Sequence, residues 1–242
     1  MSVKPLSFAC CACLAALIFA RSAHAEPTQA FIEKPVGAGL VKMPVLPNFA
    51  KACDESQQLA ERAAALTPKT SEFITCFVPA SKWRDFQAGR ATDLYPLIGV
   101  AVARPPASGV TPDEFKKIVE AARKQLGDLL ANGGAAKRLA EQDAALARGG
   151  HDFQRRNFKQ AYGGLFPTPQ DIPNFAYLTA RTADLAENGV ASQVKEVVAT
   201  GVVLHGGRLI SLSVVDGASP DAELSPVQNI TREWIRAFAS LN

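Results

Sequence analysis

Residues 197–215 read VVATGVVLHGGRLISLSVV, and this stretch decides the fold. Two runs rich in apolar and β-branched residues, 195–204 and 209–215, flank the tetrapeptide His205-Gly206-Gly207-Arg208. Glycine readily adopts the positive φ angles that a tight turn requires, so the stretch predicts a β-hairpin.

An amphipathic helix is expected after the hairpin. Ser225-Pro226 would open it, since proline is favoured in the first helical turn, and Asn242 would end it. Its inner face would carry apolar residues at helical spacing, namely Val227, Ile230, Trp234, Ile235 and Phe238.

A central strand and another helix are expected upstream. The run Tyr95–Arg104 (YPLIGVAVAR) is nearly all apolar, as in a strand covered on both faces. Thr111-Pro112-Asp113-Glu114 then offers a hydroxyl N-cap, a proline at the first helical position and a glutamate at the third. This combination predicts a helix start.

Weaker patterns predict the remaining elements. Residues 26–47 are rich in proline and glycine and predict an extended, partly mobile arm. A helix capped by Asn48 would run to about Leu66. Further segments are a strand at 72–78, a short turn or helix at 81–86, a helical pattern at 135–148, a flexible glycine- and proline-punctuated stretch at 149–173, and a strand at 175–182.

Strands early and late in the chain, with helices between and after them, predict an α+β fold. The expected architecture is an antiparallel β-sheet with helices on one face. No repeat or linker divides residues 48–242, so one domain is expected there.

The hairpin at 197–215, the helix ending in WIRAFASLN (234–242) and the pattern Thr111-Pro112-x-x-Phe115 together carry a resemblance. They are similar to uncharacterised exported bacterial proteins with a PsbP-like α/β/α sandwich fold. The similarity lies mainly in residues 95–126 and 197–242. It implies an antiparallel sheet flanked by helices, and it brings no catalytic residue.

Residues 1–25 have the parts of a cleavable secretory signal peptide. Lys4 supplies a positive start, residues 6–20 are almost wholly apolar, and Ala23-His24-Ala25 has the small-x-small form that precedes a cut. Cleavage between Ala25 and Glu26 would leave 217 of the 242 residues as a periplasmic or secreted chain. The apolar core is shorter than the roughly 20 residues that span a bilayer, and no other stretch of the sequence approaches that length, so no stable membrane span is expected in the mature chain.

A lipoprotein acylated at Cys10, Cys11 or Cys13 is the competing interpretation of this leader. None of these cysteines has an aliphatic residue three positions before it, which disfavours acylation. After cleavage at Ala25 the chain would hold 24 Lys and Arg against 23 Asp and Glu, a net charge of +1. Nucleic acid is therefore not an expected partner, because its binding needs a concentrated basic face.

Cys53 and Cys76 would be the two cysteines of the mature chain. In an oxidising compartment a single pair favours a disulfide. A metal site would need further His or Cys ligands, and a redox pair is usually spaced C-x-x-C. The pair therefore predicts a structural disulfide.

No motif for catalysis or cofactor binding is present, and neither a cofactor nor a metal is expected. H-E-x-x-H, the P-loop and G-x-S-x-G are all missing from the sequence. Ser192-x-x-Lys195 matches one part of the penicillin-binding pattern, and the other parts do not follow it. Asp216, Asp221 and Glu223 are interpreted as a solvated acidic turn rather than a Ca²⁺ site, and Trp83 and Trp234 as core or groove-lining residues.

Two functions stay open. The first is a non-enzymatic accessory or binding module whose partner is an envelope protein or another envelope component. Its contacts are expected on the arm and on residues 149–175, since loops carry most recognition. The second is a periplasmic hydrolase acting on an envelope component, built around His151 or His205 with carboxylates distant in sequence.

Overall fold

The structure is a computed structural model that describes residues 30–37, 39–91, 93–104, 109–131, 140, 143–144, 153–187, 190–217 and 224–241. The expected signal peptide with its Ala25–Glu26 cleavage site lies outside the described residues, and so do His151, Asp221 and Glu223. Most of the helical pattern at 135–148 is outside them as well.

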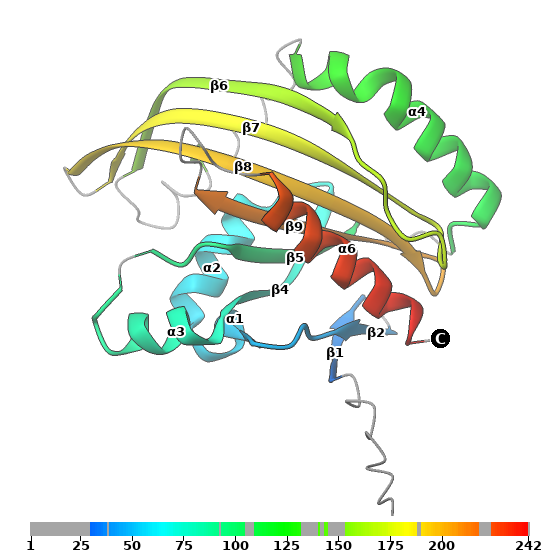
Figure 1. Cartoon of the computed structure of the whole chain (residues 1–242), viewed down its shortest axis with the longest axis horizontal. Helices are drawn as coiled ribbons and strands as arrows, with labels where there is room; N and C mark the ends of the chain where they lie inside the picture. Colours follow the sequence, from blue (N-terminus) through cyan, green and yellow to red (C-terminus); the bar gives the residue numbers. More distant parts are fainter. Residues whose placement is uncertain are drawn as a thin grey trace, which may run out of the picture.

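Within the described part, the main sheet has seven antiparallel strands in the order β3-β4-β5-β9-β8-β7-β6 (Figure 1). Helices lie on both faces of this sheet, so the predicted α+β class and antiparallel sheet are confirmed. The strands are β3 (Phe49–Ala50), β4 (Ser71–Pro79), β5 (Leu97–Ala103), β6 (Phe153–Leu165), β7 (Asn174–Glu187), β8 (Val190–His205) and β9 (Arg208–Gly217).

β8 and β9 form the hairpin that the sequence predicts. His205 pairs with Arg208, and Gly206 and Gly207 make the turn with φ of 55° and 72°. Only glycine adopts such angles without a steric cost. β5 pairs with β9, which puts the predicted central strand inside the sheet.

Helix α6 (Ser225–Ala239) covers one face, called here the α6 face. Its side chains Trp234, Ile235 and Phe238 are at most 1% exposed and belong to the main hydrophobic core. The helix packs closely because Gly201 of β8 faces it. A Cβ atom at Gly201 would lie 2.8 Å from Cγ2 of Thr231.

The segment expected to be an extended arm is a β-hairpin in the structure. β1 (Phe31–Val36) pairs with β2 (Gly39–Pro44), and their inward side chains complete the core on the α6 face. Val36 and Met43 are 1% and 0% exposed. Tertiary burial therefore orders a segment whose prolines and glycines predicted an arm.

The other face, called here the α4 face, carries α1 (Ala52–Glu55), α2 (Gln57–Leu66) and α4 (Pro112–Ala131). α1 and α2 pack on β4, and Phe115 of α4 contacts Phe175 of β7. The expectation of helices on one face is therefore wrong. The resemblance implies helices flanking the sheet, as in an α/β/α sandwich, and the structure has that arrangement.

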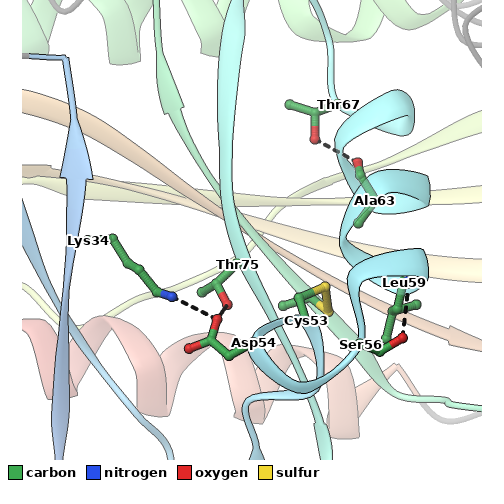
Figure 2. Close-up of a disulfide and its surroundings, with 9 residues drawn as sticks. Lys34, Cys53, Asp54, Ser56, Leu59, Ala63, Thr67 and Thr75 are labelled. Carbon is green, nitrogen blue, oxygen red and sulfur yellow. Dashed lines mark hydrogen bonds and ion pairs between the residues drawn. A yellow bond between two sulfur atoms is a disulfide. The ribbon is translucent and has the colours of Figure 1, made fainter.

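The predicted helix from Asn48 to Leu66 starts later than expected. Asn48 has φ of 65°, and the next two residues pair with β4 instead of entering a helix. Ser56 is the effective N-cap, because its hydroxyl accepts a hydrogen bond of 3.3 Å from the Leu59 amide (Figure 2).

Cys53 and Cys76 form the predicted disulfide, which ties α1 to β4 (Figure 2). The neighbouring Asp54 accepts hydrogen bonds from Lys34 of β1 at 2.8 Å and from Thr75 of β4 at 3.0 Å. Asp54 therefore connects the β1–β2 hairpin to strand β4 of the main sheet.

Helix α4 starts at the predicted capping box. The Glu114 amide donates to the Thr111 hydroxyl at 3.2 Å, and the Glu114 carboxylate accepts from the Thr111 amide at 2.8 Å. The expected flexible segment at 149–173 instead contains the edge strand β6. Its pairing with β7 shifts register near Asn157 and near Gly163, and such bulges protect an exposed sheet edge.

Candidate functional site

The α4 face of β7 carries a row of side chains that changes from aromatic to charged along the strand. Alternate residues of a strand share one face, so Phe175, Tyr177, Thr179 and Arg181 follow one another there. At about 3.4 Å per residue, the row from Phe175 to Arg181 is about 20 Å long.

Pairing in the sheet extends this row sideways. Thr200 of β8 lies opposite Tyr177, Ser213 of β9 opposite Thr200, and Gly99 of β5 opposite Ser213. A Cβ atom at Gly99 would meet no atom within 4 Å, so the surface above this residue is open. The middle of the face is thus built from small and hydroxyl-bearing residues.

We call this surface the strip. It consists of Tyr95, Gly99, Tyr162, Phe175, Tyr177, Thr179, Arg181, Glu196, Thr200 and Ser213.

Aromatic rings form one end of the strip. The ring centroids of Phe175 and Tyr177 are 6.4 Å apart, and those of Tyr177 and Tyr162 are 6.5 Å apart. Phe115 of α4, which lies on the same face of the sheet, packs against Phe175 with ring centroids 6.1 Å apart. Phe175, Tyr177 and Tyr162 are half-buried, so they combine an apolar surface with polar hydroxyl groups on the two tyrosines.

A charged cluster forms the other end. The Glu196 carboxylate accepts a hydrogen bond of 2.6 Å from the Tyr95 hydroxyl at Oε1 and another from Nε of Arg181 at Oε2. The side chain of Glu196 is 14% exposed and that of Arg181 is 35% exposed. The cation and the anion neutralise each other, so this end carries no net charge.

Tyr95 stays a hydrogen-bond donor over a wide pH range. Burial, together with the negative charge of Glu196 and the hydrogen bond to it, raises the pKa of the Tyr95 hydroxyl well above its ordinary value. The Asp93 carboxylate accepts from the Tyr95 amide at 3.3 Å and from Lys82 at 2.6 Å, which fixes the segment that presents Tyr95.

The middle of the strip holds two threonine hydroxyls that are not used within the protein. Four threonines are buried in the described residues, and the side chains of two of them bond within the protein: Thr75 to Asp54 and Thr231 to the Val227 carbonyl. The side-chain hydroxyls of Thr179 and Thr200 form no hydrogen bond within the described residues, which leave these two side chains 6% and 9% exposed. Neither hydroxyl oxygen is among the buried polar atoms without a partner, so both still reach the surface of the sheet. A ligand on this face could therefore donate to them and accept from them.

The histidine sites considered from the sequence do not assemble in the described residues. His205 lies at the end of β8, with its ring edge-on to Phe238 at 5.3 Å. Burial, and to a smaller extent the charge of Lys42, lowers its pKa. No carboxylate or hydroxyl of the described residues forms a hydrogen bond with it.

The remaining sequence candidates have structural roles. Ser192 and Lys195 lie three residues apart in β8, so their side chains point to opposite faces of the sheet. Asp216 accepts a hydrogen bond from the Gly217 amide at 2.9 Å. Trp83 of α3 (Ala80–Gln87) donates to Glu55 at 2.5 Å, and Trp234 lies in the core against Phe238.

The strip was missed because its residues come from five strands and a loop that are far apart in the sequence. One signal was available. Thr200, Ser211 and Ser213 interrupt an otherwise apolar hairpin in the middle of the sheet, where apolar residues are the rule.

The described residues contain no group of three or more His, Cys, Asp or Glu side chains that could hold a metal ion. Nor does any helix among them have the length and apolar character needed to cross a membrane.

Comparison with known proteins gives little similarity. No protein-family model and no curated protein matches the chain. Among solved structures, the chain is similar to the Ran-binding protein Mog1p of Saccharomyces cerevisiae, with 11% identity over 88% of this chain and 94% of that one, at a TM-score of 0.36. A point mutant of Mog1 is 12% identical over 87% of this chain and 94% of that one, at a TM-score of 0.34. Scores this low carry no argument about this chain.

Proposed function

We propose that this protein is an exported, non-enzymatic binding module of the bacterial envelope and that the strip is its binding surface. The observation that carries the proposal is that the side-chain hydroxyls of Thr179, Thr200 and Ser213, on three adjacent strands, form no hydrogen bond within the described residues, while the surface above Gly99 on the next strand is open. A ligand seated on the strip would supply the missing hydrogen bonds. We also propose membership of the exported PsbP-like proteins that the chain resembles.

Export is supported by the leader at 1–25 and by the disulfide between Cys53 and Cys76. Disulfides persist in oxidising compartments and are rare in the cytosol. For the hydrolase alternative, the described residues place only His205, whose ring packs edge-on against Phe238 and has no hydrogen bond to a carboxylate or hydroxyl among them.

Expression of the full chain in a Gram-negative host tests export. We expect the protein in the periplasmic fraction, with a first residue of Glu26 by mass spectrometry. Replacing Ala25 with a bulky residue (Ala25→Leu) should block the cut and leave the leader attached. An uncleaved wild-type chain in the cytoplasm would refute the proposal.

Retention of envelope material tests binding. Purified protein is immobilised and exposed to a detergent extract of the envelope, and the retained material is compared among the wild type, Thr200→Val and Thr182→Val. Thr182 lies on the same β7 as Thr179 and on the other face, so its variant is the matched control. We expect retention by the wild type and by Thr182→Val, and loss with Thr200→Val. Equal retention by all three would place binding elsewhere.

A further inference from the structure

We infer that the strip binds a short, uncharged oligosaccharide. This inference rests on the proposed function, since it names the ligand of the same surface.

The position of the strip excludes the usual mode of peptide recognition. Extended peptides add to the free edge of a sheet, where backbone N–H and C=O groups are unpaired. Of the strip, only Tyr162 lies on the edge strand β6; its other strand residues lie on β5, β9, β8 and β7, which are inner strands whose backbone groups are paired on both sides. A ligand on this face therefore meets side chains alone.

The polar side chains of the strip match sugar hydroxyls. Thr179, Thr200 and Ser213 can each donate and accept a hydrogen bond, as a sugar hydroxyl also can, and none of them bonds within the described residues. A hydrocarbon chain would leave these groups unpaired and would be disfavoured for that reason.

The charge balance favours a neutral ligand. Arg181 is paired with Glu196, and Lys82 with Asp93 beside Tyr95. An acidic ligand would have to compete with these carboxylates for the cations. A hydroxyl of a neutral sugar could accept a hydrogen bond from the Arg181 guanidinium or donate one to the Glu196 carboxylate, and neither ion pair would have to break.

The aromatic end and the length of the strip complete the match. Tyr177 and Tyr162 present half-buried rings, and the C–H face of a sugar can pack on such rings. A row of about 20 Å exceeds a single sugar and suits a short chain of them.

Ligand-observed NMR with the full chain purified after export tests this inference. The probes are tetra-N-acetylchitotetraose, maltotetraose and cellotetraose, with dodecanoate and inorganic phosphate as competing chemistries. We expect saturation transfer to at least one tetrasaccharide. We also expect about three- to tenfold weaker binding with Thr200→Val, as for one lost hydrogen bond, and unchanged binding with Thr182→Val.

Three outcomes would overturn the inference: no signal from any tetrasaccharide, equal affinity in Thr200→Val, or a preference for dodecanoate or phosphate. If no sugar bound but Thr200→Val still lost the retention of envelope material, the ligand class would be refuted and the proposed binding function would stand. Failure of both experiments would refute the proposed function itself.

Discussion

Tyr95 and Glu196 are 101 positions apart in the sequence, and the Tyr95 hydroxyl donates a hydrogen bond of 2.6 Å to the Glu196 carboxylate. The bond connects the loop before β5 to the inner strand β8, and Arg181 of β7 occupies the other carboxylate oxygen. Glu196 thus holds three segments together at one end of the strip.

Replacing Tyr95 with phenylalanine should lower the free energy of unfolding by about 1–2 kcal/mol, because a hydrogen bond to a charged group is lost. Urea unfolding at pH 8 measures the change. Tyr162→Phe is the matched control, since the Tyr162 hydroxyl has no hydrogen bond to a described residue. A loss as large in Tyr162→Phe as in Tyr95→Phe would contradict the assigned role.

The raised pKa of Tyr95 predicts a loss of stability in alkali. The unfolded chain releases the Tyr95 proton near pH 10, whereas the native chain retains it. The native state therefore binds more protons, and its stability is complete below about pH 10 and falls as the pH rises beyond that value. Between pH 8 and 11, the free energy of unfolding should decrease more steeply with pH for the wild type than for Tyr95→Phe. Parallel pH profiles of the two proteins would rule out this linkage.

Thr200→Val should leave the stability unchanged or raise it by up to about 1 kcal/mol. Valine keeps the shape of a side chain that is 9% exposed and removes a hydroxyl that has no hydrogen bond within the described residues. Thr75→Val, which removes a bond to Asp54, should instead cost about 1 kcal/mol. Thermal unfolding compares the two variants. A destabilised Thr200→Val would mean that its hydroxyl already serves the fold.

The sequence predicts the elements whose signals are local. The Gly206-Gly207 turn, the Thr111 capping box and the stripe of α6 each lie within a few residues, and each is present in the structure. The β1–β2 hairpin was missed because its order comes from packing against α6 and distant strands. Asn48 was predicted to be a helix N-cap, but the two residues after it pair with β4, and this pairing outweighs the local capping preference of asparagine.

The candidate site could not be predicted in the same way. Tyr177 and Thr200 become neighbours only through the register of β7 against β8, and Tyr95 reaches Glu196 only through the sheet order. A shift of one residue in either pairing would turn these side chains to the other face. The histidines were candidates because an imidazole can serve in acid–base chemistry. That chemistry does not determine which residues the sheet places next to them.

Gly201→Ala should destabilise the protein by about 1–3 kcal/mol through overpacking. The new methyl group would lie 2.8 Å from Cγ2 of Thr231 and 3.3 Å from Cδ1 of Ile235, and a β-branched side chain in a helix has little freedom to move away. Gly99→Ala is the control, because its Cβ would meet no atom within 4 Å. Urea unfolding should separate the two variants, and equal midpoints would contradict close packing of α6 on β8.

Removing the disulfide by the double substitution Cys53→Ala and Cys76→Ala should cost about 3.5 kcal/mol, because the bond closes a loop of about 24 residues in the unfolded chain. Dithiothreitol should lower the urea midpoint of the wild type and leave that of the double variant unchanged. Lys34→Met provides a second comparison. It removes the contact of Asp54 with β1 and keeps the disulfide, and a partly exposed ion pair contributes at most about 1 kcal/mol. If mass spectrometry of the exported protein found two free thiols, or if reductant left the wild-type midpoint in place, the disulfide would have no part in holding α1 on β4.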